Sequence, residues 1–313
     1  MFKQQQPGLS LHPYFLLFIS ILSVSISSIL IKFFSETPTS VAGMYRLFIT
    51  VLIMLPFVSW SKLTSLEMGK RDWLTVILAG VFIGLHFLFW MESLVHTSVA
   101  SSMVILTLQP LFVMAGSYFM FKEKAGPLTI ACMLAALLGS VIIAWGDIGI
   151  SREALIGDGL SLVGTLMVSA YMLAGQKVSR KLDAKLYSVV VFSIGGFVLL
   201  IYNVVNKQPL IQYEASHWIY FLLLAIIPTV LGQYIFNILL KSVGATTVSV
   251  GIIGEPVIAI LLAFVLLGES VSRFQWAGGL LTLLGMGMYF WLKSTTAKRN
   301  VNTIQNGDVQ KAS

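Results

Sequence analysis

Long apolar runs, separated by short polar gaps, fill this chain from residue 14 to residue 292. A helix needs about 20 apolar residues to cross the hydrocarbon core of a bilayer, and a helix satisfies its own backbone there. The pattern therefore predicts an all-α integral membrane protein. Ten spans can be drawn, at 14–34, 39–58, 74–95, 99–121, 127–146, 158–177, 187–205, 218–240, 245–267 and 274–292.

The second half of the chain repeats the first at an offset of 146 positions. A proline, a glutamate and a glycine recur in the same order and at the same spacing: Pro110, Glu123 and Gly139, then Pro256, Glu269 and Gly285. Paired apolar segments, each with a mid-segment proline, are typical of transporters built from two repeats. Because each half has an odd number of spans, the second half enters the membrane in the opposite sense. The sequence predicts two inverted five-helix repeats.

The repeats are expected at 14–146 and 158–292, joined by an outer linker at 147–157. A short N-terminal segment, 1–13, precedes them. The tail at 293–313 is polar and lacks periodicity, so we expect it to be disordered. The first span follows only one lysine and is longer than a signal-peptide core of roughly 7–15 residues, so we expect it to be retained.

Lysines and arginines are divided unevenly between the two sides of the predicted membrane. If both termini face the cytoplasm, 15 of them lie inside and three lie outside. Lys122 and Lys124 fall inside, whereas their repeat equivalents, Gly268 and Ser270, fall outside and carry no charge. Positive residues favour the cytoplasmic side. We therefore expect a multi-pass protein of the plasma membrane with both termini in the cytoplasm.

The composition agrees with lipid as the main solvent. Hydrophobic residues make up 57% of the chain and charged residues only 11%, against about 25% in soluble proteins. The net charge of +7 does not indicate nucleic-acid binding, because the basic residues lie in the short gaps between apolar runs. Cys132 is the only cysteine, which excludes an intramolecular disulfide and a cysteine-based metal site.

Taken together, these residues resemble the EamA-type branch of the drug/metabolite transporter superfamily over 14–292. The resemblance also includes Lys32 at the end of the first span, Arg46 after Pro38 in the second, and Asp158 and Tyr171 in the sixth. A Trp-Gly pair that is common in the first span of the family is absent here. The resemblance implies an alternating-access carrier that exports small metabolites, amino acids or drugs. It leaves the cargo and the direction open.

Glu255 is an ionisable residue near the middle of the span at 245–267. Such residues are costly in a membrane and usually have a partner or a function. Pro256 has no N–H, so the carbonyl of Ile252 loses its helical partner. A broken helix with a free carbonyl beside a carboxylate fits a proton or cation site. The alternative is a neutral Glu255 that hydrogen-bonds a neighbouring helix. In the first half, Gln109 and Pro110 replace this acid–proline pair by an amide and a proline.

Two basic residues lie within or at the edge of spans. Arg46 remains charged at any relevant pH and can bind a carboxylate or a phosphate through its forked guanidinium. A structural ion pair or snorkelling to the outer interface would explain it equally well. Lys32 can reach lipid headgroups or pair with Glu36, four residues on. For each of the two residues, the sequence leaves open whether it forms an ion pair, reaches the interface or contacts an anionic group of the cargo.

Five further polar or aromatic candidates lie within spans. His86 and Trp90 are four residues apart and share a helix face. Tyr234 and Asn237 are three apart and can face one cavity, and Tyr171 lies in the sixth span. Aromatic walls with a few polar groups are typical of small-molecule sites. Polar residues in spans serve as interhelical contacts just as often.

Pro228 predicts a bend in the span at 218–240, in addition to the breaks at Pro110 and Pro256. Small residues in the fifth and tenth spans permit either a homodimer or close packing within one chain. The sequence has no H-E-x-x-H, G-x-S-x-G or nucleotide-binding motif. We therefore expect no enzymatic activity, no metal and no cofactor.

The mechanism that these features favour is secondary transport of a small molecule, coupled to protons. Helix groups rock around a cavity at the middle of the membrane, and Glu255 changes its protonation between states. Arg46 and Lys32 orient an anionic or zwitterionic cargo group, while Tyr171, Trp90 and Tyr234 line the cavity. An exporter of drugs or organic cations with the same fold is the alternative, and a membrane enzyme is disfavoured.

Overall fold

The structure is a computed structural model that describes residues 12–33, 37–59, 68–145, 151–267 and 271–312. These parts of the chain are helical, without β-strands. In chain order the helices are α1 (Pro13–Phe33), α2 (Thr39–Met54), η1 (Leu55–Phe57), α3 (Lys70–His96), α4 (Val99–Leu106), α5 (Gln109–Phe121), α6 (Pro127–Ala144), α7 (Arg152–Val178), α8 (Ala184–Val205), α9 (Ala215–Leu224), η3 (Ala225–Tyr234), α10 (Ile235–Ser242), α11 (Gly244–Ile252), α12 (Glu255–Leu267) and α13 (Arg273–Ala312).

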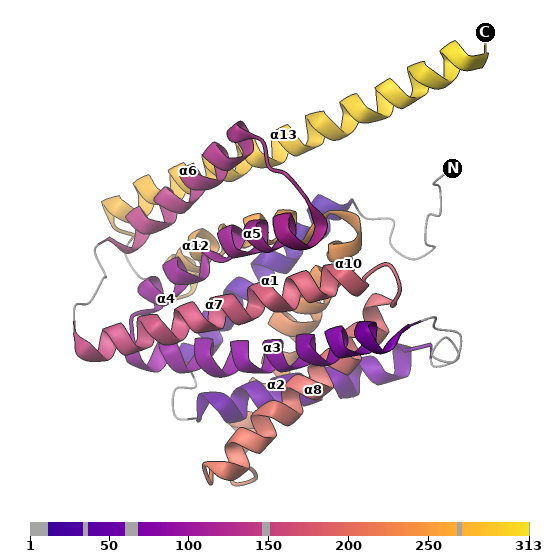
Figure 1. Cartoon of the computed structure of the whole chain (residues 1–313). Coiled ribbons are helices and arrows are strands. Elements are labelled where there is room, and N and C mark those ends of the chain that lie inside the picture. Colours follow the sequence, from indigo (N-terminus) through magenta and orange to yellow (C-terminus); the bar gives the residue numbers. More distant parts are fainter. Residues whose placement is uncertain (1–11, 34–36, 60–67, 146–150, 268–270, 313) are drawn as a thin grey trace.

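The helices form a bundle in which α1 begins, and α13 ends, on the same side (Figure 1). Among the described residues, nine stretches are long and apolar enough to cross a bilayer, and they coincide with the first nine predicted spans. The tenth predicted span lies in α13, which is not among these nine. The predicted all-α membrane fold is confirmed.

Helix boundaries in the two halves repeat at the same offset of 146 positions as the sequence. Helix α4 ends at Leu106 and α11 at Ile252, while α5 begins at Gln109 and α12 at Glu255. Helices α6 and α13 also begin at equivalent positions, 127 and 273. The fourth and ninth spans are therefore broken at the same place, just before their prolines.

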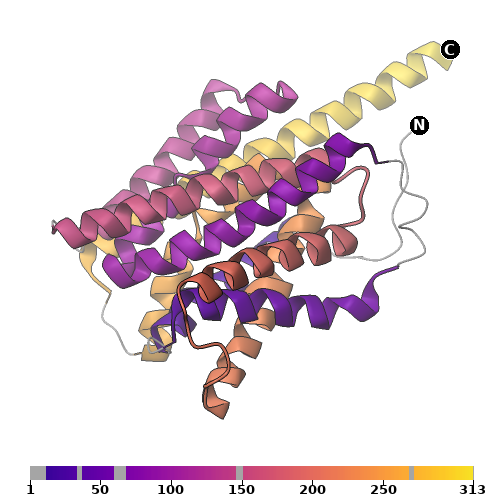
Figure 2. The ribbon, with the colours of Figure 1, turned by 60° about the horizontal axis from the view of Figure 1, so that its bottom comes forward.

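Packing between helices follows the same relation. Helix α3 packs chiefly against α7, and its counterpart, the segment α9–η3–α10, packs against α1, the counterpart of α7. Helix α2 packs on its own counterpart α8, and α6 packs on α13 (Figure 2). Such an exchange of partners is what a two-fold relation between inverted repeats produces.

The two breaks have the same local cause. Pro110 and Pro256 are the second residues of α5 and α12, where a helix does not need the missing N–H. Upstream, the N–H groups of Leu108 and Gly254 each bond to the carbonyl three residues back, which tightens and ends the preceding helix. The backbone at mid-span is thereby opened at two equivalent points.

The third predicted irregularity takes a form that the sequence does not specify. Pro228 lies inside η3, a π-helical stretch between α9 and α10. Proline cannot bond to the carbonyl four residues back, and its ring crowds that carbonyl. The wider π-helical turn relieves this crowding, as in other helices that are distorted near functional sites.

Small residues hold α6 close to α13. A Cβ atom on Gly139 would meet Thr282, and one on Gly285 would meet the backbone of Ala136. The Thr282 hydroxyl donates to the Ala136 carbonyl at 3.3 Å. These glycines serve packing within the chain, which is one of the two roles that the sequence left open.

The ends of the chain differ in part from our expectation. Helix α13 continues to Ala312, beyond the end of the tenth predicted span, and disorder of the tail stays a prediction. Extending an existing helix requires no new nucleus, and no proline interrupts this segment. Helix α7 likewise begins at Arg152, inside the predicted linker. The segment 1–11, residues 146–150, Glu36 and Glu269 lie outside the described residues.

Candidate functional site

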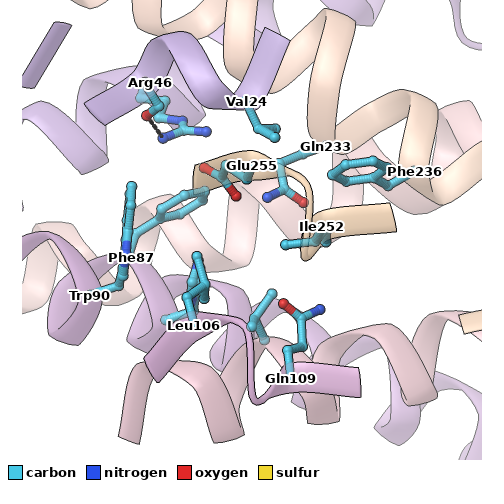
Figure 3. Close-up of a pocket in the computed structure, with 13 residues that line it drawn as sticks. Val24, Arg46, Phe87, Trp90, Leu106, Gln109, Gln233, Phe236, Ile252 and Glu255 are labelled. Carbon is cyan, nitrogen blue, oxygen red and sulfur yellow. Dashed lines mark hydrogen bonds between the residues drawn. The ribbon is translucent and has the colours of Figure 1, made fainter. Parts of the chain in front are cut away.

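A cavity lies between the two halves, beside the breaks in the fourth and ninth spans (Figure 3). Its volume is about 30 Å³, which leaves room for about two water molecules. A metabolite would require the surrounding helices to move apart. The lining residues are Val24, Ser27, Arg46, His86, Phe87, Trp90, Leu106, Gln109, Val168, Gln233, Phe236, Ile252 and Glu255.

Arg46 is almost completely buried, with 1% of its surface exposed. Its Nε donates to Thr229 Oγ1 at 2.7 Å, and its Nη1 donates to Ser27 Oγ at 3.2 Å. Its Cζ lies 4.2 Å from the centre of the Phe87 ring, within the range of a cation–π interaction. Among the described residues, no acidic side chain forms an ion pair with Arg46. Neutral groups therefore hold the guanidinium in place and leave its charge available.

The hydroxyl that binds Arg46 is itself fixed by the π-helical stretch. Thr229 Oγ1 donates to the Leu224 carbonyl at 2.8 Å, five residues back along the chain. Pro228 has no N–H to donate to this carbonyl, and the Thr229 hydroxyl donates to it. Because the hydroxyl proton is used in this bond, the oxygen can only accept from Arg46. A local backbone defect thus becomes part of the arginine site.

Glu255 is the first residue of α12 and is 4% exposed. Figure 3 shows its carboxyl group directed into the space that Arg46 and Gln233 also face. The start of a helix favours negative charge, which offsets part of the desolvation cost of a carboxylate. Ser25 Oγ on α1, which donates to the Ile21 carbonyl at 2.7 Å, lies 3.4 Å from the Glu255 backbone carbonyl, so α1 lies close to the break. The cavity is therefore lined by a basic residue, Arg46, and an acidic residue, Glu255, that do not form an ion pair with each other.

Gln109, the repeat equivalent of Glu255, faces the same cavity from the start of α5 (Figure 3). Its Nε2 lies 3.0 Å from Met172 Sδ, a weak acceptor on α7. The sequence identified this amide as the point where the repeats differ, but not as a site residue. Its offset from Glu255 was the signal that places it here.

His86 and Trp90 share a face of α3, as predicted, and both line the cavity. Their rings stack with centroids 5.8 Å apart and an angle of 11° between the planes. His86 Nδ1 lies 2.9 Å from the Gly164 carbonyl and must donate to it, because a carbonyl only accepts. The neutral ring therefore presents Nε2 as an acceptor.

Three other candidates do not line the cavity in this structure. Tyr171 donates to Asn237 Oδ1 at 2.7 Å, and Asn237 Nδ2 donates to Ser188 Oγ at 2.9 Å. These groups satisfy one another between α7, α10 and α8, which is the interhelical role considered as an alternative. Tyr234 is only partly buried and packs against the core. We therefore correct the expectation that Tyr171 and Tyr234 form cavity walls.

One predicted site residue has no described side chain, and three residues around Arg46 were not predicted. Lys32 lies in α1, but its side chain is outside the described part of the structure. Ser27, Phe87 and Thr229, which surround Arg46, were not predicted. Serine, threonine and phenylalanine are ordinary in membrane helices, so the sequence carried no signal for them.

Polar contacts also join helices near both ends of the bundle. On the predicted cytoplasmic side, Gln176 Nε2 donates to Glu123 Oε1 at 2.8 Å, and the Ala245 N–H donates to Gln176 Oε1 at 2.6 Å. On the predicted outer side, Thr39 donates to Glu92 at 2.7 Å. These contacts connect the two repeats or neighbouring helices above and below the cavity.

Comparison with known proteins gives one family. The EamA-like transporter family matches residues 11–145 and again 155–291. The uncharacterised transporter YxxF of Bacillus subtilis (strain 168) is 23% identical over 287 residues, which cover 90% of each chain. An uncharacterised transporter of Clostridium kluyveri is 26% identical over 232 residues, covering 72% of this chain and 74% of its own. One crystal structure shares the fold, with a TM-score of 0.73, 19% identity, and coverage of 90% of this chain and 96% of that one.

Proposed function

We propose that this chain, which belongs to the EamA-like transporter family, is a proton-coupled exporter of a small zwitterionic metabolite such as an amino acid. Its family makes it a membrane transporter. The cargo, the coupling ion, the outward direction and a plasma-membrane location with cytoplasmic termini are our proposal. The observation that carries it is the pair Arg46 and Glu255, which are buried, opposite in charge and exposed to one cavity without an ion pair between them.

A zwitterion satisfies both members of this pair. Buried charges are costly unless they are paired and hydrogen-bonded. The Arg46 guanidinium can bind a carboxylate through two parallel hydrogen bonds. The Glu255 carboxylate can accept from an ammonium group. The two ends of an amino acid present these groups a few bonds apart, so one small molecule neutralises both charges at once.

Coupling to protons follows from competition at Glu255. A proton and the ammonium group of the cargo both neutralise the same carboxylate. Each time the binding site changes the side of the membrane to which it opens, it therefore carries either a proton or the cargo. An inward proton gradient then drives the cargo outward by exchange, with the two helix arrangements favoured by different occupants. Among the described side chains, Arg46 and His86 are the other titratable groups that line this cavity with Glu255.

One observation favours a second candidate, an exporter of organic cations. Phe87, Trp90 and Phe236 line the cavity together with Glu255. Aromatic faces near a carboxylate suit a cation. Arg46 argues against this cargo, because a cation would meet a like charge at close range.

Proteoliposomes distinguish the candidates. With an acidic lumen and an alkaline exterior, the wild-type protein should take up labelled amino acids against their gradient as protons leave. Uptake of organic cations, with none of any amino acid, would contradict the zwitterion proposal. Uptake that ignores the pH gradient would contradict coupling to protons.

A further inference from the structure

Two residues that line the cavity each have a buried polar atom with no hydrogen-bond partner in the part of the chain that the structure describes. These atoms are the indole N–H of Trp90 and the Oε1 of Gln233. Trp90 is 3% exposed and Gln233 is 7% exposed, so the surrounding lipid and solvent do not reach them readily. Most buried polar groups in folded proteins are paired, so two such exceptions in one cavity require an explanation.

Packing fixes the ring of Trp90 and the backbone that carries Gln233. The Trp90 ring is stacked on His86, and the His86 ring is fixed by the Gly164 carbonyl. Gly164 in turn lies against the Trp90 backbone, where even a Cβ atom would meet it. Gln233 belongs to η3, whose Gly232 is packed against Val24 on α1. The indole N–H is therefore held in its present direction, and the backbone that carries Gln233 is held against α1.

The chemistry of the two atoms defines their complement. An indole N–H only donates, and an amide oxygen only accepts. The group that satisfies both must accept one hydrogen bond and donate another. A hydroxyl or a carboxamide does so, whereas a carboxylate lacks the donor, an ammonium lacks the acceptor and an alkyl group lacks both.

We propose that Trp90 and Gln233 form a subsite that selects a neutral hydrogen-bonding side chain on the cargo, a hydroxyl or a carboxamide. This inference rests on the proposed function, in which Arg46 and Glu255 bind the charged ends of the zwitterion. Desolvating an unsatisfied donor and acceptor disfavours an aliphatic side chain in the same space. The preferred cargo is then a polar, uncharged zwitterion rather than an aliphatic one.

Matched pairs of amino acids test the subsite. Threonine and valine have nearly the same shape, as do asparagine and leucine, and each pair differs in hydrogen bonding. Labelled counterflow into proteoliposomes should favour the polar member by about tenfold in the wild-type protein. Trp90→Phe keeps the stacked ring but removes the donor, and Gln233→Leu removes the acceptor. Each should bring the ratio close to one, chiefly by slowing the polar member.

Trp145→Phe is the control and should leave the ratio unchanged, because Trp145 is the C-cap residue of α6 and 65% of its surface is exposed. Size-exclusion profiles and thermal unfolding establish that the variants fold, and either variant alone suffices for the test. Equal counterflow of both members in the wild-type protein would overturn the subsite while the proposed function stands. So would a preference that survives in both variants. Transport of no zwitterion at all would overturn the subsite and the proposed function together.

Discussion

The Nε of Arg46 donates at 2.7 Å to the Thr229 hydroxyl, which itself donates to the Leu224 carbonyl. Pro228, four residues on, has no N–H to donate to that carbonyl. The π-helical stretch around Pro228 in the eighth span thus provides, through Thr229, a hydrogen-bond partner for Arg46 in the second span. The residue that predicts a bend from the sequence therefore also contributes to the candidate binding site.

Thr229→Val should destabilise the protein by about 1–3 kcal/mol, because it removes the buried hydroxyl that accepts from Arg46 Nε and donates to the Leu224 carbonyl. Thermal unfolding in detergent measures the effect. Thr295→Val, at an exposed position of α13, is the matched control and should have little effect. Equal unfolding temperatures for the two variants would show that the bonds around Thr229 contribute nothing.

Arg46→Lys should weaken zwitterion binding by about tenfold or more, although the positive charge is kept. Lysine cannot form the two parallel bonds to a carboxylate, and it cannot keep both Thr229 and Ser27 as partners in the same geometry. Arg46→Ala should reduce the affinity for zwitterions more than the affinity for organic cations. Thermal-shift titration with both classes of compound measures this, and an equal loss for both would indicate a structural role.

Gln176→Ala should open the end of the bundle that we predict to be cytoplasmic, because it releases both Glu123 and the Ala245 N–H. Ser117, which is 1% exposed and accepts from Thr246 near this end, provides a reporter position. In a Cys132→Ser background, Ser117→Cys should react with a maleimide about tenfold faster once Gln176 is changed. That factor corresponds to a bias of about 1.4 kcal/mol between conformations.

Gln208→Ala, on the side predicted to be outside, is the control for this experiment and should leave the labelling rate as it was. An unchanged rate in the Gln176 variant would mean that the contact does not hold this end of the bundle closed.

Gly285→Ala should cost about 1–3 kcal/mol through overpacking, because its Cβ would lie 2.6 Å from the Ala136 nitrogen. Gly287→Ala, two residues on in the same helix, meets nothing within 4 Å and should be neutral or slightly stabilising. Thermal unfolding of the two variants side by side checks this. Equal stability would mean that α6 and α13 are not packed as closely as the structure has them.

The fold was largely predictable because a membrane places strict demands on a sequence. Each crossing needs a long apolar run, so the spans could be counted, and the prolines marked where they break. What the sequence did not reveal was the π-helical form around Pro228, since a proline is equally compatible with a simple kink.

The candidate site was predictable only where lipid makes a residue conspicuous. Arg46 and Glu255 stood out because charges within spans are rare and costly. Thr229 did not, because its role depends on a helix from the other half of the chain. For Tyr171 and Asn237 the sequence left a cavity role and an interhelical contact open, and in the structure their polar groups bond to each other.

The most direct test of the whole account is proton-driven accumulation by Glu255→Gln in proteoliposomes. The amide keeps the size of the side chain but can neither take up a proton nor neutralise an ammonium group. With an acidic lumen, the wild-type protein and the exposed-site control Glu214→Gln should accumulate labelled threonine, and Glu255→Gln should show no gradient-driven accumulation while unfolding at a similar temperature. Accumulation by Glu255→Gln to the wild-type level, with the same dependence on pH, would contradict the account.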